Sequence, residues 1–372
     1  MSGKGILIYL LTLCFTANGV IASETGDVIN VQGHWIRDMQ GLVMADPQPS
    51  GLVHWRNQLL TLSDRSALLK HQRSLHAIDK QSMRVSANAM PMQLADNVTN
   101  SCFGHYLAAT PDLEALVVDP DDDSVFYTIT EDATYAPLTA KCAKQWRGSG
   151  STAFPTLLVR MQLGSDNQLT LTHVRPLKYQ PEYVVGDFPN DGIEGLAFAN
   201  DRWLYLALEK DKHHRARIFR IKMDDNFWLS AGFVNVDDPQ LSLPEGDAGE
   251  FPLNGMDYYP SEQSEHPGYL IAAARNNDQL WIIDLAKQQP TRILQMAYWL
   301  VNDQQQAKCD AEDPIPYTAI EGVAVEGETL WLINDPWKEN YRKNIRCEAN
   351  RQHYDNMSPL LFSLPIDKGW FE

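Results

Sequence analysis

Positive charge is scarce in this chain of 372 residues, which has 31 Lys and Arg against 48 Asp and Glu and a net charge of −17. Nucleic-acid binders concentrate positive charge on one face, so this balance argues against a nucleic-acid partner. The motifs GxSxG, HExxH, GxxxxGK[ST] and GxGxxG are absent, which leaves serine hydrolases, zinc proteases, P-loop NTPases and dinucleotide enzymes without support. No low-complexity linker divides the chain, and we expect one domain over residues 23–372.

Long apolar runs are also lacking after the N-terminus, where no stretch reaches the roughly 18 residues of a membrane span. At the N-terminus, Lys4 precedes an apolar run over residues 6–15, and Val20, Ile21 and Ala22 precede an expected cleavage site. This pattern predicts a signal peptide over residues 1–22 and an exported protein, periplasmic or secreted. An uncleaved membrane anchor is the alternative.

Cysteines are few, and four of the five lie outside the predicted signal peptide: Cys102, Cys142, Cys309 and Cys347. An even number in an exported chain predicts two disulfides, for which three connectivities are possible. A zinc site is the alternative, although no CxxC spacing supports it.

The chain contains a pattern that recurs five times: a polar residue, a small residue, a short β run, a turn and a second β run that ends in a charged residue. The copies pair residues 50–53 with 59–64, 114–117 with 126–131, 194–197 with 204–209, 254–257 with 270–275, and 321–324 with 330–335. Further strand-like runs follow each pair, such as residues 216–221 and 228–234, which predicts four strands per repeat.

Five repeats of this kind predict an all-β fold, a five-bladed β-propeller. The fifth repeat has only three predicted strands, the last over residues 360–364, and an additional strand over residues 28–31 precedes the first repeat. We expect this N-terminal strand to close the ring and remove an exposed edge. A six-bladed propeller and a β-sandwich are the alternatives.

The long connections fall before the first strand and after the second strand of each repeat, so antiparallel pairing places them on one face of the disc. Long loops on a rigid scaffold usually carry function, and we expect the site on this face. Cys102 and Cys309 precede a first strand, whereas Cys142 and Cys347 follow a second strand. This internal symmetry predicts disulfides between Cys102 and Cys142 and between Cys309 and Cys347.

The polar residue that opens each repeat should face the propeller axis. Together these residues would form a ring of five side-chain oxygens, contributed by Ser50, Glu114, Glu194, Asn254 and Glu321. Three carboxylates at close range repel one another unless a cation or a proton lies between them. Hard oxygen ligands suit Ca²⁺, so the ring predicts a calcium site. A dry polar ring paired with Arg275 is the alternative.

The order Ser, Glu, Glu, small polar, Glu resembles the calcium-activated nucleotidase (apyrase) family, which implies a five-bladed propeller with an axial Ca²⁺. Residues 50–53 and 63–66 are similar to the first-blade signature of that family, and Asn254 stands where the family has serine. Residues 190–198 and 319–324 resemble the exported phytase-like and SdiA-regulated propeller families. These resemblances imply a phosphoester substrate.

Charged residues at the ends of the second strands should lie on the same rim as the ring. Phosphoester hydrolysis can be catalysed by a metal that polarises a phosphoryl oxygen, an arginine that binds a second oxygen and a carboxylate that orients the attacking water. We therefore assign catalytic roles to four residues, Asp64, Arg65, Glu209 and Arg275, and substrate-binding roles to five, Glu131, Lys210, Asn276, Asp335 and Lys338. The alternative is that these charges pair with one another near the axis.

The sequence thus predicts an exported, calcium-dependent phosphoester or ester hydrolase, similar to a nucleotidase or a phytase. The expected protein is a monomer that acts on an anionic small molecule, with no nucleic-acid partner and no membrane span after signal cleavage. The competing hypothesis is a non-catalytic propeller in which calcium is structural and the long loops recognise a protein or a glycan.

Overall fold

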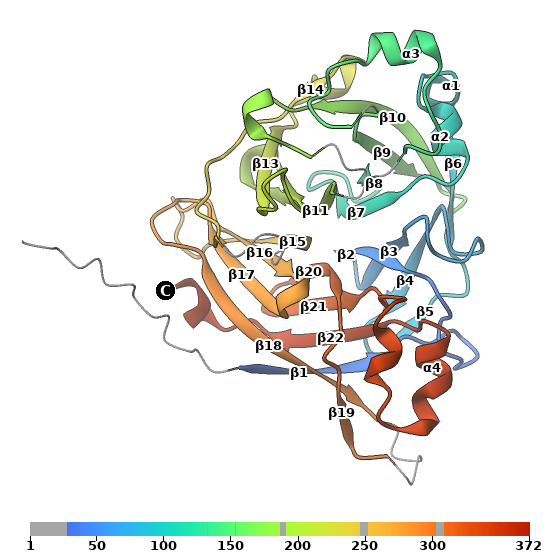
Figure 1. The fold of residues 1–372 in the computed structure, drawn as a ribbon, viewed down its shortest axis with the longest axis vertical. Helices are drawn as coiled ribbons and strands as arrows, with labels where there is room; N and C mark the ends of the chain where they lie inside the picture. Colours follow the sequence, from blue (N-terminus) through green and yellow to red (C-terminus); the bar gives the residue numbers. More distant parts are fainter. Residues whose placement is uncertain (1–27, 132, 153, 187–190, 246–251, 303–308) are drawn as a thin grey trace, which may run out of the picture.

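The computed structural model describes residues 28–131, 133–152, 154–186, 191–245, 252–302 and 309–372. The predicted signal peptide therefore lies outside the described residues. The structure is mostly β, with short helices in the connections (Figure 1). Among the described residues, no helix is long and apolar enough to cross a membrane.

The described strands form three hydrogen-bonded sheets, of ten, nine and three strands. Parallel pairs, β6 (Met90–Leu94) with β10 (Leu169–Lys178) and β1 (Ile29–Trp35) with β18 (Arg292–Val301), join antiparallel stretches within the two larger sheets, and the antiparallel stretches are described below as five groups in chain order. The first contains β2 (Pro49–Trp55), β3 (Gln58–Ser63), β4 (Ser74–Asp79), β5 (Arg84–Val85) and β6 (Met90–Leu94). The second contains β7 (Leu113–Val118), β8 (Val125–Thr130), β9 (Leu157–Leu163) and β10 (Leu169–Lys178). The third contains β11 (Ile193–Ala199), β12 (Trp203–Leu208) and β13 (Arg217–Lys222).

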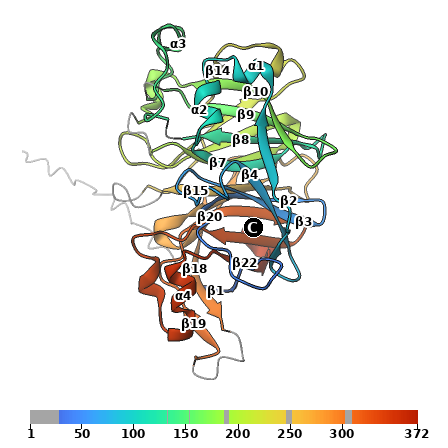
Figure 2. The same ribbon diagram turned by 90° about the vertical axis from the view of Figure 1, so that its right-hand side faces the viewer.

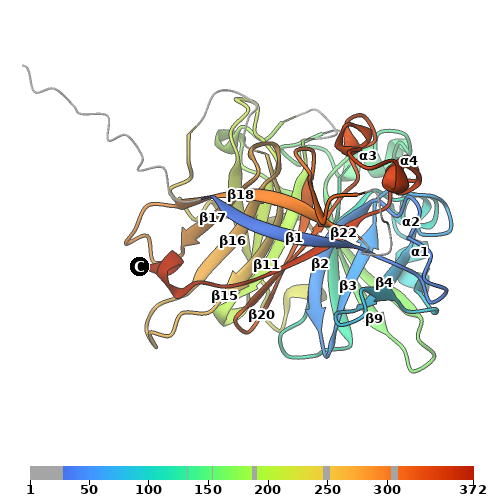
Figure 3. The ribbon, with the colours of Figure 1, turned by 90° about the horizontal axis from the view of Figure 1, so that it is seen from below.

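The fourth group contains β15 (Leu253–Tyr259), β16 (Tyr269–Ala274), β17 (Gln279–Asp284) and β18 (Arg292–Val301), with β19 (Glu312–Pro314) paired to β18. The fifth contains β20 (Ile320–Glu326), β21 (Thr329–Asn334), β22 (Leu360–Pro365) and the N-terminal strand β1 (Ile29–Trp35). Strand β1 pairs antiparallel with β22 and parallel with β18, and Figure 3 shows it between them. The N-terminal strand therefore completes the last group, as the sequence predicted.

The first strands of the five groups surround a common axis. Each contacts its neighbours in cyclic order: β2 with β7, β7 with β11, β11 with β15, β15 with β20, and β20 with β2. Five hydrophobic clusters fill the spaces between consecutive groups, and the buried Trp55, Trp281 and Trp331 belong to three of them. Apolar burial between neighbouring sheets thus supports a propeller-like arrangement.

Two expectations about strands were wrong. Four strands per repeat do not occur in the third group, whose sheet has three strands. The expected strand over residues 228–234 is instead the 3-10 turn η3 (Phe227–Leu229) followed by β14 (Val234–Asn235), which pairs with β10 of the second group. Alternation of apolar residues predicted an extended strand here, but the Asp224 carbonyl accepts from the Phe227 N–H and the chain turns.

The helices lie in the connections. These are α1 (Asp96–Thr99), α2 (Gly104–Ala108), α3 (Ala140–Gln145), α4 (Arg351–Asp355), and the 3-10 turns η1 (Pro181–Tyr183), η2 (Asn200–Arg202), η4 (Arg275–Asn277), η5 (Tyr341–Asn344), η6 (Glu348–Asn350) and η7 (Lys368–Phe371). Helices α3 and α4 follow second strands, and both project from the same face of the molecule (Figures 2 and 3). This is the face on which the sequence placed the long loops.

The predicted disulfides are confirmed. Cys102 is bonded to Cys142, and Cys309 is bonded to Cys347, with Cα atoms 5.6 Å and 5.4 Å apart. Each bridge ties the connection before a first strand to the connection after the second strand of the same group. Both bridges therefore stabilise the loops of one face.

Candidate functional site: an acidic ring on the axis

A β-bulge occurs at the same place in each of the five first strands. The pairing register shifts at Glu194, Asn254 and Glu321 in β11, β15 and β20, across Ser50 and Gly51 in β2, and at Ala115, the residue after Glu114, in β7. A bulge inserts one unpaired residue and re-aims its side chain. The polar residue that opens each repeat in the sequence lies in or next to this bulge. The repeated sequence motif therefore coincides with the β-bulge of each first strand.

The small residue after each ring residue allows neighbouring first strands to approach closely. Gly51 has φ of 148°, and a Cβ atom there would lie 2.8 Å from the backbone nitrogen of Leu116 in the next group. At Gly322, a Cβ atom would lie 2.4 Å from Ile333 Cγ2 and 3.0 Å from the backbone nitrogen of Leu52. Any larger side chain would push these strands apart.

The five ring residues are all buried, with exposed fractions of 1–7% for Ser50, Glu114, Glu194, Asn254 and Glu321. Carboxylate oxygens of Glu114, Glu194 and Glu321 all lie within 4.8 Å of one another. A cavity of about 10 Å³ on the axis is lined by Glu194 and Glu321 and by residues that follow ring positions, among them Gly51, Ala115 and Gly255. This is the space of about one water molecule or one small ion. The structure therefore brings the three predicted carboxylates of the ring together.

Asn254 is a ring residue whose side chain is buried without a hydrogen-bond partner among the described residues. Only 1% of the residue is exposed, and neither Oδ1 nor Nδ2 has a partner among the described residues. Leaving a buried amide unpaired costs on the order of 1–3 kcal/mol, so most buried polar groups have a partner. Asn254 thus points to a group at the axis that would accept or supply this interaction.

A further carboxylate, that of Glu131, extends the acidic site beyond the ring. Glu131, at the end of β8, accepts a hydrogen bond from the Gly192 N–H at 2.9 Å and shares a second one with Glu194. Burial raises the pKa of Glu131 to about 8, and burial together with the charge of Glu131 raises the pKa of Glu194 well above its usual range. Two carboxyls that share a hydrogen bond need a proton or a cation between them.

Arg275 supplies positive charge beside the ring. Its Nη1 donates to Glu321 Oε1, and its Nη2 donates to Glu209 Oε1 at 3.3 Å. Burial raises the pKa of Glu321 to about 7, although Arg275 acts in the opposite direction. Arg275 therefore pairs with one of the three ring carboxylates, whereas no hydrogen bond or ion pair between its guanidinium and Glu114 or Glu194 is found among the described residues.

Glu209 and Lys210 follow β12. The Glu209 Oε2 atom has no hydrogen-bond partner in the described part of the chain, and the Lys210 ammonium lies 4.0 Å from it. Lys210 lies closer to Asp191, at 3.1 Å. Burial raises the pKa of Glu209, against the effect of Arg275 and Lys210. The lysine is thus held at the rim by two carboxylates.

Arg65 is engaged by a residue that sequence reasoning missed. Its backbone N–H and its Nε donate to the two carboxylate oxygens of Asp112, at 3.0 Å and 3.1 Å, and its guanidinium lies over the Tyr135 ring. Asp112 also lies within 4.8 Å of ligand atoms of Glu114 and Glu131. Its position two residues before Glu114, on the same side of an extended strand, is the signal that could have identified it.

The remaining predicted residues lie around the first, fourth and fifth groups. Burial, followed by the charge of Asp112, raises the pKa of Asp64 to about 6. Burial and the charges of Glu321 and Asp64 raise the pKa of Asp335 well above its usual range, and its Oδ1 has no described partner. Lys338 donates to the Ser66 carbonyl at 2.6 Å. Asn276 is exposed, and no described contact ties it to the ring.

The arrangement can bind a cation better than it can bind a free anion. The acidic clusters found among the described residues contain only Asp and Glu: Asp112, Glu114, Glu131, Glu194, Glu209 and Glu321. These hard oxygen donors suit Ca²⁺ or Mg²⁺ rather than a metal that prefers nitrogen or sulfur. An anionic group could approach this rim only after a cation or protons had reduced its charge.

No protein-family model matches the chain, and a search of the curated proteins found no match. Among solved structures, the Malassezia sympodialis allergen Mala s 1 is 8% identical, with a TM-score of 0.46, over 86% of this chain and 94% of that chain. The PQQ-bound aldose sugar dehydrogenase of Streptomyces coelicolor is 14% identical, with a TM-score of 0.36, over 85% and 93%. An exo-β-1,3-galactanase of Phanerochaete chrysosporium is 13% identical, with a TM-score of 0.44, over 91% and 64%. Similarities this distant carry no inference about activity.

Proposed function

We propose that this protein is an exported, five-bladed β-propeller that binds Ca²⁺ at its axis. The observation that supports the proposal is the unpartnered Asn254 side chain, buried in a ring that also contains three carboxylates within 4.8 Å of one another. A calcium ion would bring Asn254 Oδ1 a partner and would offset the repulsion between Glu114, Glu194 and Glu321.

The residues fit this ion. Five side chains at the axis offer oxygen atoms, and Ca²⁺ takes six to eight oxygen ligands with waters completing the set. Ser50, Glu114, Glu194, Asn254 and Glu321 would hold it. Once bound, the ion would supply positive charge that can polarise a phosphoryl or carbonyl oxygen. Arg275 would continue to neutralise Glu209 on the rim beside it.

Thermal melting in Ca²⁺, in Mg²⁺ and in chelator tests the proposal. A ligand that binds only the folded state, at 100 times its dissociation constant, stabilises it by about 2.7 kcal/mol. We expect Ca²⁺ to raise the melting temperature of the protein, and Glu194→Gln to remove this rise. Glu326→Gln is the matched control, because Glu326 lies at the other end of β20 and pairs with Lys80. The control should keep the full Ca²⁺ response. Identical melting curves with and without Ca²⁺ would refute axial binding.

Phosphoester hydrolysis is the activity that we propose for this rim. The observation that favours it is Glu209 Oε2, which has no hydrogen-bond partner among the described residues, whereas Oε1 accepts from Arg275. A water oxygen would attack phosphorus as the bond to the ester oxygen breaks. Glu209 would take the proton of that water and return it to the alcohol that leaves. Arg275 and Lys210 would balance the negative charge of the phosphoryl group.

Phosphate release from p-nitrophenyl phosphate, ADP and phytate, measured with Ca²⁺ present, tests this activity. We expect turnover in the unaltered protein and a loss of at least 100-fold in Glu209→Gln, whose Ca²⁺-dependent melting should persist. Glu182→Gln, on the exposed turn η1, is the control and should keep full turnover. Absence of release from all three compounds would instead favour a binding propeller, since Arg65, Arg275 and Lys210 are already paired with carboxylates.

A further inference from the structure

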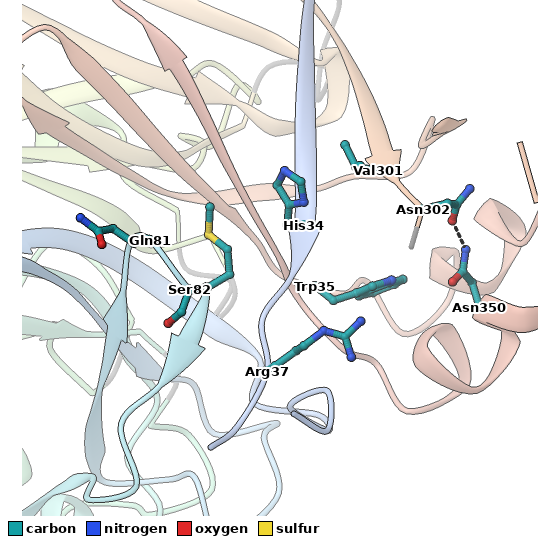
Figure 4. Close-up of a pocket in the computed structure, with 9 residues that line it drawn as sticks. His34, Trp35, Arg37, Gln81, Ser82, Val301, Asn302 and Asn350 are labelled. Carbon is teal, nitrogen blue, oxygen red and sulfur yellow. Dashed lines mark hydrogen bonds between the residues drawn. The ribbon is translucent and has the colours of Figure 1, made fainter. Parts of the chain in front are cut away.

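A second cavity lies away from the axis, on the outside of the fifth group. It has a volume of about 380 Å³ and lies where the end of β1 meets the turn between β4 and β5 and the turn η6 (Figure 4). Cavities of this volume are in the range of small-molecule sites. The residues used below are His34, Trp35, Arg37, Gln81, Ser82 and Asn350.

The chemistry of this cavity is the opposite of that of the axial ring. None of the described residues that line it is acidic, in a chain with a net charge of −17. Arg37 brings a guanidinium, and Gln81 and Asn350 bring amides, all of which can donate hydrogen bonds. Ser82 brings a hydroxyl that donates to Asp79 Oδ1 at 2.6 Å and can therefore accept a hydrogen bond from a ligand. A guanidinium with no competing carboxylate in the lining favours an anionic group, and amides and hydroxyls favour hydroxyl groups.

The cavity is held by fixed elements. The Arg37 N–H donates to the Met83 carbonyl at 3.0 Å, the Val85 N–H donates to the Arg37 carbonyl at 2.7 Å, and Arg37 Nη1 donates to the Gly41 carbonyl at 3.0 Å. On the other wall, Asn350 Nδ2 donates to Asn302 Oδ1 at 2.5 Å (Figure 4). Groups held in this way lose little conformational entropy when a ligand binds.

Unpaired polar atoms lie behind the cavity wall. The indole of Trp35, which lines the cavity, packs edge-on against His353 and Tyr354, with ring centroids 5.1 Å and 5.2 Å apart. His353 Nδ1 and the Tyr354 hydroxyl are buried and have no hydrogen-bond partner among the described residues. Burial and then the positive charge of Arg37 lower the pKa of His353. Burial also lowers the pKa of His34. Among the described residues that line the cavity, Arg37 is therefore the cationic one near neutral pH.

We propose that this cavity binds a small hydroxylated carboxylate. Its carboxylate would pair with the Arg37 guanidinium, and its hydroxyls would bond to the side chains of Gln81, Ser82 and Asn350. The site is separate from the axial ring, because its lining comes from the outermost strand of the fifth group and from connections. It does not depend on the proposed calcium site.

Calorimetric titration with D-gluconate, and with sorbitol as the uncharged counterpart, tests the proposal. We expect saturable gluconate binding, at least tenfold weaker binding of sorbitol, and at least tenfold weaker gluconate binding by Arg37→Gln. Arg84→Gln is the matched control, because Arg84 lies on the adjacent strand and its side chain bonds to the Met39 carbonyl outside the lining. The control should bind gluconate as the unaltered protein does.

Gln81→Leu gives a second test, because Gln81 is exposed and its replacement leaves the core intact. We expect weaker gluconate binding at an unchanged melting temperature. Glu194→Gln should bind gluconate normally, so failure of the calcium proposal would not affect this result. Absence of saturable gluconate binding, or unchanged affinity in both Arg37→Gln and Gln81→Leu, would overturn the proposal.

Discussion

Arg275 donates a hydrogen bond to Glu321, and through this contact a guanidinium from η4 lies against the axial ring. The same side chain bonds to Glu209 at 3.3 Å, so it links the ring to the rim. One residue therefore belongs both to the proposed cation site and to the proposed catalytic rim. Its replacement should disturb both, which is why Glu209→Gln separates turnover from calcium binding better than a change at Arg275.

Replacing Arg275 by Gln should destabilise the protein most strongly in chelator. Removing one partner of a buried ion pair typically costs about 3–5 kcal/mol, because the other charge is left unpaired. Ca²⁺ should recover part of this loss by neutralising Glu321. Urea unfolding with and without Ca²⁺ measures both effects. Arg202→Gln, which breaks a pair with Asp119 on the opposite face, should lose stability without any recovery by Ca²⁺. Equal recovery in the two variants would contradict the prediction.

Asn254→Leu should be close to neutral or stabilising in chelator, since it removes an unpaired buried amide that costs on the order of 1–3 kcal/mol. The same change should abolish the melting shift caused by Ca²⁺. Asn334→Leu is the contrasting variant, because Asn334 is also fully buried but donates to the Thr318 carbonyl and accepts from the Leu360 N–H. It should destabilise the protein in both conditions, and a large loss for Asn254→Leu in chelator would contradict the assignment.

Gly322→Ala should lower the free energy of unfolding by about 1–3 kcal/mol through overpacking. The added Cβ atom would lie 2.4 Å from Ile333 Cγ2 and 2.6 Å from Leu52 Cβ, between the fifth and first groups. Gly232→Ala is the control, because Gly232 is exposed and its nearest contact would be Ser230 Oγ at 3.5 Å. Urea unfolding should show little change for the control. Equal stability of the two variants would mean that the ring strands can separate at little cost.

Stability should fall as the pH falls from about 6.5 to about 4, in part through His71. Burial, followed by the charges of His76 and Lys70, lowers the pKa of His71 to about 4 in the folded protein, below its value in the unfolded chain. The unfolded chain therefore binds the proton first, and the contribution of the neutral imidazole is present above pH 6.5 and lost below it. His71→Gln, which can still donate to the Ala45 carbonyl, should show a shallower decline of melting temperature with pH. An unchanged slope would contradict this prediction.

Removing either disulfide should destabilise the native protein by about 2–4 kcal/mol, because each closes a loop of similar length. The bonded cysteines are 40 and 38 residues apart in sequence. Replacing both cysteines of one pair by Ser avoids a free thiol, and thermal melting measures the loss. The two double variants should lose similar amounts. A loss confined to one pair would show that the other bridges a segment already ordered in the unfolded chain.

The ring could be predicted from the sequence because the same local device occurs five times. A polar residue followed by a small residue marks the bulge in every first strand, from Ser50 and Gly51 to Glu321 and Gly322. This pattern could not identify Asp112 as a site residue, because a carboxylate occurs two residues before the ring residue in one repeat only. The pairing of Arg65 with Asp112 could not be predicted from the sequence either, because that contact joins connections 47 residues apart.

The sequence by itself determined the β pairs, the cysteine pairing and the positions of the five ring residues, because these depend on local periodicity and on repetition. Only the tertiary structure decided which charges neutralise one another, because Arg275, Glu209 and Glu321 come from three different groups. It also decided that residues 227–235 turn away from the third sheet and that Asn254 has no hydrogen-bond partner among the described residues. Such outcomes depend on which side chains the packed sheets bring within a few ångströms, and spacing along one chain does not specify that distance.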